Sequence, residues 1–366
     1  MPFYSLSTVQ FRNLADSTID LLAPEVFFTG ENGQGKSNLL EALYYSAYGA
    51  SFRTHTDSEI VKRGFDSMSV RTLFKEGDGD THTTRISIER GLKKIERDGK
   101  MVKDRKELVS AMPCVLYNHD DLDFVSGSPE RRRFFLDQTL SMYDLLYIDT
   151  TRRYKRVLKS RNLMLKEGRT DILDTYDFQL AQNGLEVQKQ RKICVFKFNQ
   201  IFSRLYAEVS GIEGVSIRYN PSWKKADGDS AIPSVEDVIA HLQKKRESER
   251  IMGTSLSGPH RDRIDFEREG TAFVPTASTG QRRLIALVLR SAQASFYREE
   301  TGRKPVLLMD DVLLELDPDK RERMTALLPE YDQLFCTFLP GEPYQRYRHN
   351  ATRIYEIASG SWQERT

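Results

Sequence analysis

Eight consecutive residues in the first tenth of the chain have the types and spacing needed to hold a phosphate group. They follow the pattern GxxxxGK[ST] and stand between an apolar run at 26–28 and a helix-like segment at 39–48. The glycines let backbone N–H groups point inward at a phosphate, and the helix that follows adds its positive end. We therefore predict a nucleotide-binding loop made of Gly30, Glu31, Asn32, Gly33, Gln34, Gly35, Lys36 and Ser37.

Two residues of this loop and a distant pair of carboxylates would carry the chemistry. The Lys36 ammonium can reach the β- and γ-phosphates of ATP, and the Ser37 hydroxyl can bind Mg²⁺. An apolar run at 306–309 ends in Asp310 and Asp311. We predict that Asp310 is a second Mg²⁺ ligand. We further predict that Lys36 and Asp311 are catalytic, with Asp311 orienting or deprotonating the attacking water.

Composition limits the class of protein. The 366 residues are 39% hydrophobic and carry 55 Lys and Arg against 53 Asp and Glu, which allows two domains, or one large domain with an insertion. The absence of a long apolar run excludes a membrane span, and the first residues do not resemble a secretion signal. The three cysteines are widely spaced and have no zinc-binding pattern. We therefore expect a cytoplasmic protein with reduced thiols.

Two other classes of phosphate-binding enzyme agree less well with the sequence. In a kinase the metal-binding acids follow a different set of motifs, whereas here they stand almost at the other end of the chain. A GTPase would also need an Asn/Thr-Lys-x-Asp segment to read guanine, and the sequence has none.

A third segment lies between the loop and the paired acids. The residues Ala277-Ser278-Thr279-Gly280-Gln281 precede a helix-like segment at 284–297. They resemble the LSGGQ signature of ABC-type ATPases, in which the signature of one subunit contacts the γ-phosphate held by the other. The resemblance implies an ATP-dependent homodimer in which Ser278, Gly280 and Gln281 bind the nucleotide. A helix cap without a ligand is the alternative for this segment.

Three further blocks are similar to those of the RecF family of bacterial recombination-repair ATPases, which is related to SMC proteins. The first is Gly-Ser-Pro-Glu-Arg-Arg-Arg-Phe-Phe-Leu-Asp at 127–137, and the second is Gly-Pro-His-Arg-Asp at 258–262. The third is Glu-Leu-Asp at 315–317, which resembles the family's D-loop. The resemblance extends from residue 11 to residue 337 and adds Arg12 and Asn13 as residues that approach the nucleotide.

The chain departs from the family pattern at three positions. His119 replaces a common proline, Leu314 replaces a small D-loop residue, and Asn118 stands where a glutamine is commoner in the wider superfamily. These departures concern residues of communication across the dimer and leave nucleotide binding unaffected.

The resemblance to the RecF family implies a function. Members bind ATP and Mg²⁺, dimerise, hydrolyse ATP slowly, and bind gapped DNA or junctions of single and double strands. They act with RecR and RecO to direct RecA loading in DNA replication, repair and the SOS response. We therefore expect a weak, DNA-stimulated ATPase that acts as a switch at the nucleoid.

The residues themselves also point to DNA. The stretch 152–169 is rich in lysine and arginine and has one acid, Glu167, so that a helix there would be basic around much of its circumference. Such a helix would make salt-dependent, sequence-independent contacts with phosphates, and an ordinary solvated helix face is the alternative. The predicted DNA-binding residues are Arg152, Arg153, Lys155, Arg156 and Lys159.

These observations predict an α/β fold, an ABC-type ATPase head with a phosphate-loop lobe of mixed and antiparallel sheets. The head would comprise 1–120 and 254–366, and a mainly helical insertion lobe would comprise 121–253. Antiparallel strands are expected over 65–103, with Asp-Gly at 98–99 as a hairpin turn.

Three other functions share parts of this pattern. An SMC-like clamp would need long heptad arms, and an ATP-coupled nuclease would need an added cluster of acids. The third is a DNA clamp without enzymatic activity, for which removal of the Asp311 carboxylate would leave DNA release unchanged.

Overall fold

A computed structural model of the chain describes residues 2–76, 79–169, 171–225, 232–312, 318–341, 345 and 348–365. The chain folds as two compact units. Unit 1 comprises Met1–Asp121 and Leu289–Thr366, and unit 2 comprises Leu122–Val288. The second division falls later than the expected position between 253 and 254, because residues of 254–288 pair with strands and helices of unit 2.

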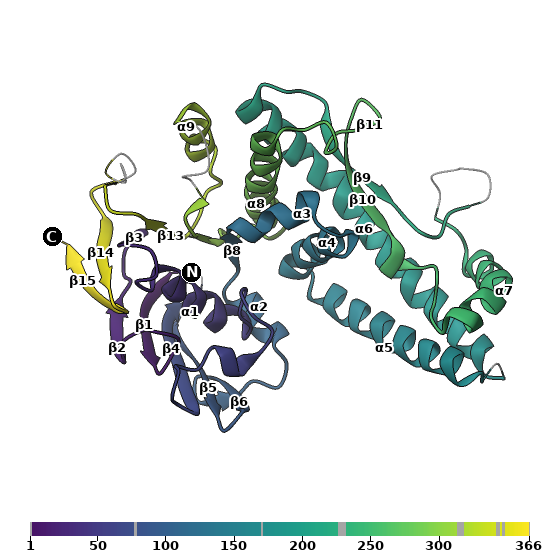
Figure 1. Ribbon diagram of the computed structural model, residues 1–366, viewed down its shortest axis with the longest axis horizontal. Coiled ribbons are helices and arrows are strands. Elements are labelled where there is room, and N and C mark those ends of the chain that lie inside the picture. The colour runs from purple at the N-terminus through teal and green to yellow at the C-terminus, as the bar shows by residue number, and fades with distance from the viewer. Residues whose placement is uncertain are drawn as a thin grey trace. The chain divides into compact units, whose positions relative to one another are not determined.

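Unit 1 contains a six-stranded sheet whose centre is parallel (Figure 1). Its order is β15-β14-β3-β13-β12-β8, with β15 antiparallel at one edge. Strands of such a sheet are buried on both faces and are therefore apolar throughout, as in β3 and β12, all of whose residues are buried. The strands are β3 (Glu25–Thr29), β8 (Cys114–Tyr117), β12 (Val306–Met309), β13 (Gln333–Phe338), β14 (Thr352–Ala358) and β15 (Ser361–Arg365).

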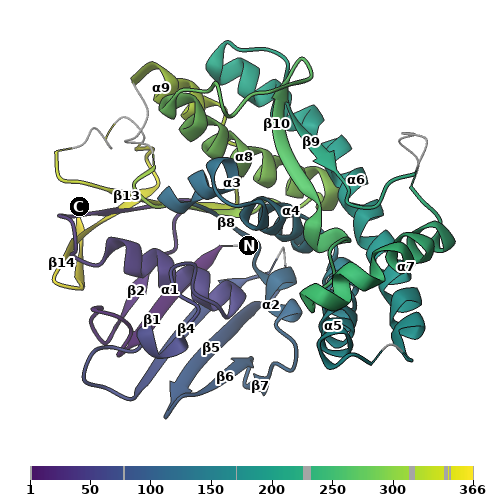
Figure 2. The same ribbon diagram turned by 45° about the vertical axis from the view of Figure 1, so that its right-hand side comes forward.

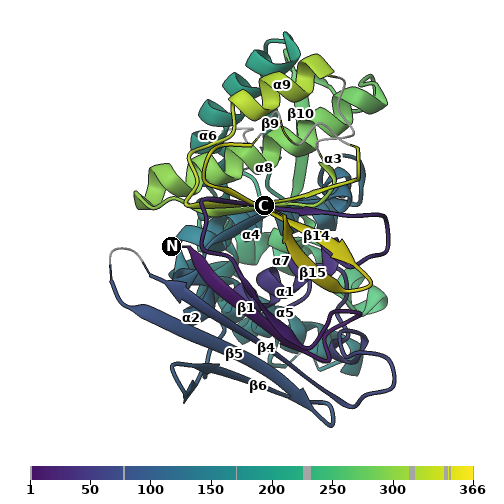
Figure 3. The same cartoon turned by 90° about the vertical axis from the view of Figure 1, so that its left-hand side faces the viewer.

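A second, antiparallel sheet of unit 1 has the order β2-β1-β4-β5-β6-β7, and Figure 3 shows β1, β4, β5 and β6 side by side. The expected hairpin turn is present at Asp98 and Gly99, both of which have positive φ. The strands are β1 (Phe3–Val9), β2 (Ser17–Asp20), β4 (Ser67–Lys75), β5 (Thr81–Glu89), β6 (Leu92–Arg97) and β7 (Lys100–Met101).

Helix α1 (Lys36–Tyr48) packs between these two sheets, as Figure 2 shows. Its residues Leu39, Leu40 and Leu43 share one hydrophobic core with Phe3 of β1 and Phe335 of β13. The core therefore fixes the start of α1, and with it the phosphate loop, against the parallel sheet. The other helices of unit 1 are α2 (Lys106–Ala111), α9 (Pro318–Ala326), the short η1 (Asp57–Glu59) and η2 (His119–Leu122), and the second half of α8 (Thr279–Thr301).

Unit 2 is mainly helical, and its long helices α5 and α6 pack along each other. Its helices are α3 (Asp123–Ser126), α4 (Pro129–Tyr143), α5 (Leu145–Glu167), α6 (Leu173–Ser210), α7 (Val235–Met252), η3 (Pro259–Arg261) and the first half of α8. A three-stranded sheet completes it, made of β9 (Val215–Asn220), β10 (Arg263–Arg268) and β11 (Thr271–Ala272). In the part of the chain that the structure describes, no helix has the length and apolar character needed to cross a membrane.

Candidate nucleotide site

The phosphate loop connects β3 to α1 at the edge where the parallel strands end. Gly35 caps α1 with a φ of 116°, in the left-handed region that side chains disfavour. A Cβ there would also lie 3.1 Å from the Asn13 Oδ1 atom. The sequence therefore needs glycine at this turn, where the loop passes into the positive end of the helix.

Lys36 is held inside the loop that precedes it. Its ammonium donates to the carbonyl oxygens of Gly30 and Glu31, at 2.7 and 3.1 Å, and the residue is buried. The positive charge is therefore positioned beneath the loop by backbone atoms, and no carboxylate among the described residues forms an ion pair with it.

Ser37 and Asp310 meet at the end of the parallel sheet. The Ser37 hydroxyl donates to the Asp310 carboxylate at 2.8 Å. Burial raises the pKa of Asp310, and the neighbouring charge of Asp311 raises it further, while the bond from Ser37 opposes the shift. A hydroxyl and a carboxylate at this separation are the hard oxygen ligands that suit Mg²⁺.

Thr337 at the end of β13 joins the two carboxylates and was not predicted from the sequence. Its hydroxyl lies 2.7 Å from Asp311 Oδ1 and 3.2 Å from Asp310 Oδ1, and it accepts a bond from the Asp311 backbone N–H at 2.8 Å. Asp311 itself has a φ of 53°, which is uncommon for a residue with a side chain. Thr337 therefore holds the predicted water-activating residue in an unusual backbone conformation.

Arg12 and Asn13, which were predicted to approach the nucleotide, follow β1. Asn13 donates to the Gly33 carbonyl at 3.3 Å and accepts from Asn38 at 2.6 Å, so it contacts the phosphate loop directly. Arg12 instead forms a two-bond ion pair with Glu41, at 2.7 and 2.9 Å. Because Glu41 is fully buried in α1, this pair anchors the segment after β1 to the helix.

The hairpin between β14 and β15 supports the loop from another side. The Gly360 N–H donates to the Gln34 carbonyl at 2.8 Å, and the Ser359 N–H donates to the Gln34 side chain at 2.6 Å. A Cβ on Gly360 would lie 1.9 Å from the Asn13 carbonyl oxygen. No sequence motif indicated that this hairpin touches the loop.

The signature segment lies in unit 2 at the start of α8. The Ser278 hydroxyl accepts from the Gln281 N–H at 3.2 Å, and the Gln281 side chain accepts from the Ser278 N–H at 2.7 Å. This reciprocal pair is a capping box. Ser278 and Gly280 are exposed, and a Cβ on Gly280 would meet no atom within 4 Å. The segment is therefore both a helix cap and an open surface at a helix start.

The basic face predicted for residues 152–159 lies on α5. All five predicted DNA-binding residues are exposed. Arg152 is 3.6 Å from Asp149, and Arg153 donates to Thr150 at 3.1 Å. Arg161, which the charge pattern placed in the same cluster, is fully buried and paired with Asp177 at 2.6 Å and Glu249 at 2.8 Å, so it is no part of this surface.

The arginines of the 127–137 block bind groups other than Asp137. Arg132 pairs with Asp265 at 2.9 Å, and Arg133 donates to the Asp262 carbonyl at 2.9 Å. Arg191 of α6 binds Asp137 instead, at 2.9 Å, and the same guanidinium binds Asp262 at 2.9 Å. The 127–137 and 258–262 blocks are therefore joined through an arginine that neither contains.

His260 of the 258–262 block is partly buried and hydrogen-bonded. Its Nδ1 lies 2.6 Å from the Tyr154 hydroxyl and its Nε2 lies 3.1 Å from the Ser255 carbonyl oxygen. Burial lowers the pKa of His260 to about 4, so the imidazole is neutral near pH 7.

Of the residues that the resemblance assigned to communication across the dimer, Asn118 lies within the described structure and Leu314 does not. The Asn118 N–H donates to Asp121 at 3.0 Å, and Asp121 is buried against Arg290 at 2.7 Å. Leu314 and the residues Glu315, Leu316 and Asp317 of the predicted D-loop lie outside the described residues.

The residues present fit a nucleoside triphosphate with Mg²⁺. Among the described residues no group of three or more His, Cys, Asp or Glu could hold a metal ion without help. Mg²⁺ is usually bound by one or two carboxylates together with substrate phosphates. A hydroxyl and a carboxylate beside a loop that presents N–H groups are such an incomplete set, which a phosphate oxygen would complete.

Comparison with known proteins gives a consistent result over the whole chain. The model of the RecF/RecN/SMC N-terminal domain matches residues 3–361. The DNA replication and repair protein RecF of Treponema pallidum (strain Nichols) is 49% identical over 359 residues, which cover 98% of this chain and 100% of the relative. The protein of the same name from Moorella thermoacetica is 33% identical over 374 residues, with 98% and 96% covered.

Solved structures show the same likeness. The structure described as the recombination mediator protein RecF-ATP in the RecFOR pathway has a TM-score of 0.90 at 27% identity, covering 100% of this chain and 98% of the other. An Smc head bound to a domain of ScpA has a TM-score of 0.59 at 16% identity, covering 100% and 97%, and shows a shared fold alone.

Proposed function

The chain belongs to the RecF family of DNA replication and repair proteins, within the RecF/RecN/SMC N-terminal domain family, and we propose that it is an ATP-dependent DNA-binding switch. Membership confirms the family resemblance found in the sequence, and the likeness to RecF and Smc heads confirms the predicted α/β ABC-type fold. The relative of high structural likeness is described as bound to ATP, which supports ATP as the nucleotide.

The contact between Ser37 and Asp310 carries the proposal. It brings the end of the phosphate loop to the end of β12, so that a hydroxyl and a carboxylate share one position. ATP would lie against the N–H groups of 30–35 with Lys36 at its phosphates, and Ser37 and Asp310 would hold Mg²⁺. When bound, the metal would neutralise charge that develops on the phosphate oxygens.

Hydrolysis would depend on Asp311 as the group that orients or accepts a proton from water. Thr337 supports this role because it fixes the Asp311 carboxylate and backbone at once. A residue that must be held in an uncommon backbone conformation is a feature of functional sites. Slow ATP hydrolysis would then reset the switch.

The closed state would be a homodimer. In unit 1 the phosphate loop would contact one side of the nucleotide. Ser278 and Gly280 of a second copy would contact the γ-phosphate from the other side. The exposure of both residues at the start of a 23-residue helix supports this, since a helix start attracts anions.

DNA would bind in a basic cleft formed on closure, with the α5 residues as phosphate contacts. We propose gapped or junction DNA as the substrate, and action with RecR and RecO in directing RecA loading at the nucleoid in the cytoplasm. The relatives' names support the repair role, and the RecFOR pathway is named for two structures of high likeness.

The decisive experiment measures the mass of the protein in solution with and without a non-hydrolysable ATP analogue and Mg²⁺. The wild-type chain should change from monomer to dimer on addition of the analogue. Lys36→Arg should not, because the bulkier guanidinium has a different reach and shape. Ser278→Arg should bind nucleotide and stay monomeric. A wild-type protein that remains a monomer at a saturating concentration of the analogue would refute the switch.

A second measurement addresses the rival nuclease. The protein is incubated with labelled gapped DNA, ATP and Mg²⁺, and we expect the DNA to remain intact. Cleavage products that disappear in Asp310→Asn would favour an ATP-coupled nuclease instead.

A further inference from the structure

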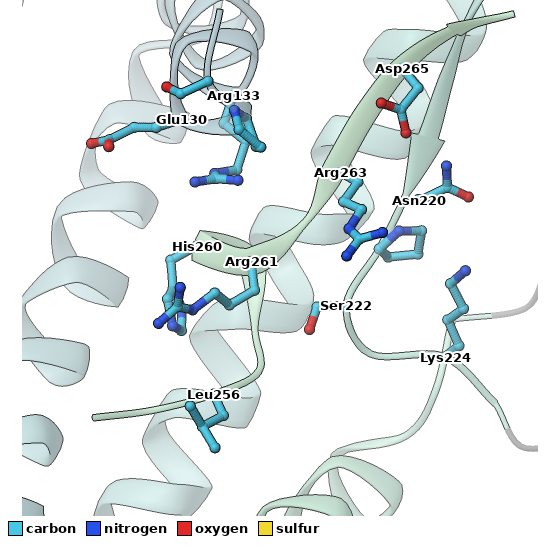
Figure 4. A pocket seen from close by; sticks show the side chains of 13 residues that line it. Glu130, Arg133, Asn220, Ser222, Lys224, Leu256, His260, Arg261, Arg263 and Asp265 are labelled. Carbon is cyan, nitrogen blue, oxygen red and sulfur yellow. The ribbon is translucent and has the colours of Figure 1, made fainter. Parts of the chain in front are cut away.

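A recess in unit 2 gathers cationic side chains that the proposed function does not use. It has a volume of about 820 Å³ and is lined by residues of α4, η3, β10 and the segment after β9. Its cationic residues are Arg133, Lys224, Arg261 and Arg263, against the two carboxylates Glu130 and Asp265. Figure 4 shows them around the recess, with His260 and Arg261 on one side and Lys224 on the other.

The positive charge of this recess is largely uncompensated. Asp265 is already paired with Arg132 at 2.9 Å. Glu130, the other carboxylate of the lining, forms no ion pair with a residue that the structure describes. Arg261, Arg263 and Lys224 are exposed. Within the described ranges none of these three side chains has an ion pair or a hydrogen bond. Several unpaired cations facing one concave space attract an anion of more than one charge.

Buried contacts of the residue between them hold Arg261 and Arg263 in place. Asp262, between them in sequence, is fully buried. Its carboxylate accepts from the Ser222 N–H at 2.7 Å and from Arg191 at 2.9 Å. Because Asp262 is anchored inward, its neighbours Arg261 and Arg263 are presented outward from a rigid base. A binding site needs this support behind the residues that contact a ligand.

The lining is better suited to the phosphodiester backbone of a nucleic acid than to an acidic protein or a free nucleotide. The apolar lining residues are Leu256, Pro129 and Pro221, so a protein partner would find no aromatic anchor there. A free nucleotide would find one aromatic ring in the lining, that of His260. Both nitrogens of this ring are already bonded, to Tyr154 and Ser255, so they are not available to recognise a base. Exposed arginines and a lysine bind phosphates without regard to base.

The recess is separate from the basic face of α5. Tyr154 is buried on α5 and bonds His260 in the lining, so this face of α5 is turned toward the recess. At about 100° per residue, Arg152, Arg156 and Lys159 fall on the opposite side of the helix from Tyr154. The two basic surfaces therefore cannot be one continuous contact with the same stretch of DNA.

We propose that this recess binds the backbone of single-stranded DNA, as a second nucleic-acid site beside the α5 face. A single strand can bend into a recess, whereas a duplex is stiff, with a persistence length of about 50 nm. The inference rests on the proposed function, because it names the part of a gapped substrate that each surface takes.

The test measures the binding of fluorescein-labelled oligo(dT), and separately of a blunt duplex, to the full chain over a range of KCl concentrations. Arg261→Ala with Arg263→Ala should weaken oligo(dT) binding about tenfold at low salt and reduce the salt slope by roughly 1.4. Duplex binding should be unchanged. Arg261→Lys with Arg263→Lys should retain the slope, since the charges remain.

The matched control removes two exposed arginines of α5, Arg152→Ala with Arg156→Ala, and should weaken duplex binding more than oligo(dT) binding. An unchanged melting temperature and unchanged tryptophan fluorescence will show that each variant is folded. If the variant with Arg261→Ala and Arg263→Ala binds oligo(dT) with wild-type affinity, the inference is overturned. Displacement of oligo(dT) by a glutamate-rich peptide at equal charge concentration would overturn it as well. Failure of the wild type to bind either DNA would instead overturn the proposed function.

Discussion

The Ser37 hydroxyl donates a 2.8 Å hydrogen bond to the Asp310 carboxylate, although 273 residues separate the two along the chain. The parallel pairing of β3 with β13 and of β13 with β12 produces this contact, because the carboxyl ends of all three strands lie at one edge. Ligands of open α/β sheets bind at this edge.

Replacement of Asp310 by asparagine should change how stability depends on pH and metal. Burial raises the pKa of Asp310, so the folded state holds this proton more tightly than the unfolded state does. The stability that results is present below the ordinary pKa of 3.8 and is lost as pH rises through the raised value. Near pH 7 without Mg²⁺, Asp310→Asn should therefore melt at or above the wild type, and calorimetry should show the difference vanish in acid.

Mg²⁺ and ATP should reverse this order. They should raise the melting temperature of the wild type, by about 2–4 °C for each kcal/mol of binding, and leave Asp310→Asn unchanged. Asp66→Asn, at an exposed position of unit 1, is the control and should follow the wild type. Equal stabilisation of all three proteins would show that Asp310 binds no metal.

Thr337→Val should reduce ATP hydrolysis more than ATP binding. Valine keeps the branched shape suited to β13 but removes the hydroxyl that contacts the Asp311 carboxylate and N–H. We expect single-turnover hydrolysis to fall about 10–100-fold, the usual effect of losing a supporting contact. Nucleotide affinity, measured with a fluorescent analogue, should change little.

Thr337→Ser provides the control, because it restores the hydroxyl and should recover most of the rate. A merely structural role for Thr337 would lower the stability of the valine variant and leave its rate per folded molecule intact.

The α5 face should contribute to duplex binding through charge alone. Arg156→Ala with Lys159→Ala removes two exposed cations and should reduce the slope of log K against log salt by roughly 1.8. Lys103→Ala, which removes an exposed cation of unit 1, should leave it unchanged. If the two proteins have the same slope in a duplex titration, this face is an ordinary solvated surface.

Arg161→Met should destabilise unit 2 strongly. Its guanidinium is fully buried between Asp177 and Glu249. Its loss leaves the buried Glu249 carboxylate without this cation and leaves Asp177 paired with Arg246. Breaking a buried pair in this way costs about 3–5 kcal/mol. Lys155→Met, at an exposed position on the same helix, should cost far less.

Trp223 allows this loss to be measured in unit 2 alone. It is one of two tryptophans and is buried in unit 2. In a Trp362→Phe background, urea unfolding followed by its fluorescence reports the surroundings of α5. Similar midpoints for Arg161→Met and Lys155→Met would contradict the predicted importance of the pair.

The sequence predicted the parts of the site whose chemistry depends on residues close together in the chain. The loop at 30–37 and the acids at 310–311 are local patterns, and the strands on either side follow from apolar runs. Thr337 could not be found in this way, because a threonine at the end of an apolar strand has no distinguishing neighbour. Its role arises from the pairing of β13 with β12, which only the fold establishes.

The charged residues of unit 2 show the same limit. Arg161 belongs to a basic stretch of sequence but is neutralised by Asp177 and Glu249 from two other helices. Arg191 lies in no motif and yet connects Asp137 with Asp262. Helical periodicity tells which residues share a face, whereas the partner of a buried charge is set by how the helices pack.

The contact of Gly360 with the phosphate loop has a genetic consequence. Because its positive φ of 80° and the nearby Asn13 carbonyl exclude any side chain there, a survey of random mutations should find this codon as intolerant as those of the loop itself. A substitution at Gly360 should therefore produce the same loss of function as one more than three hundred codons upstream, at Lys36.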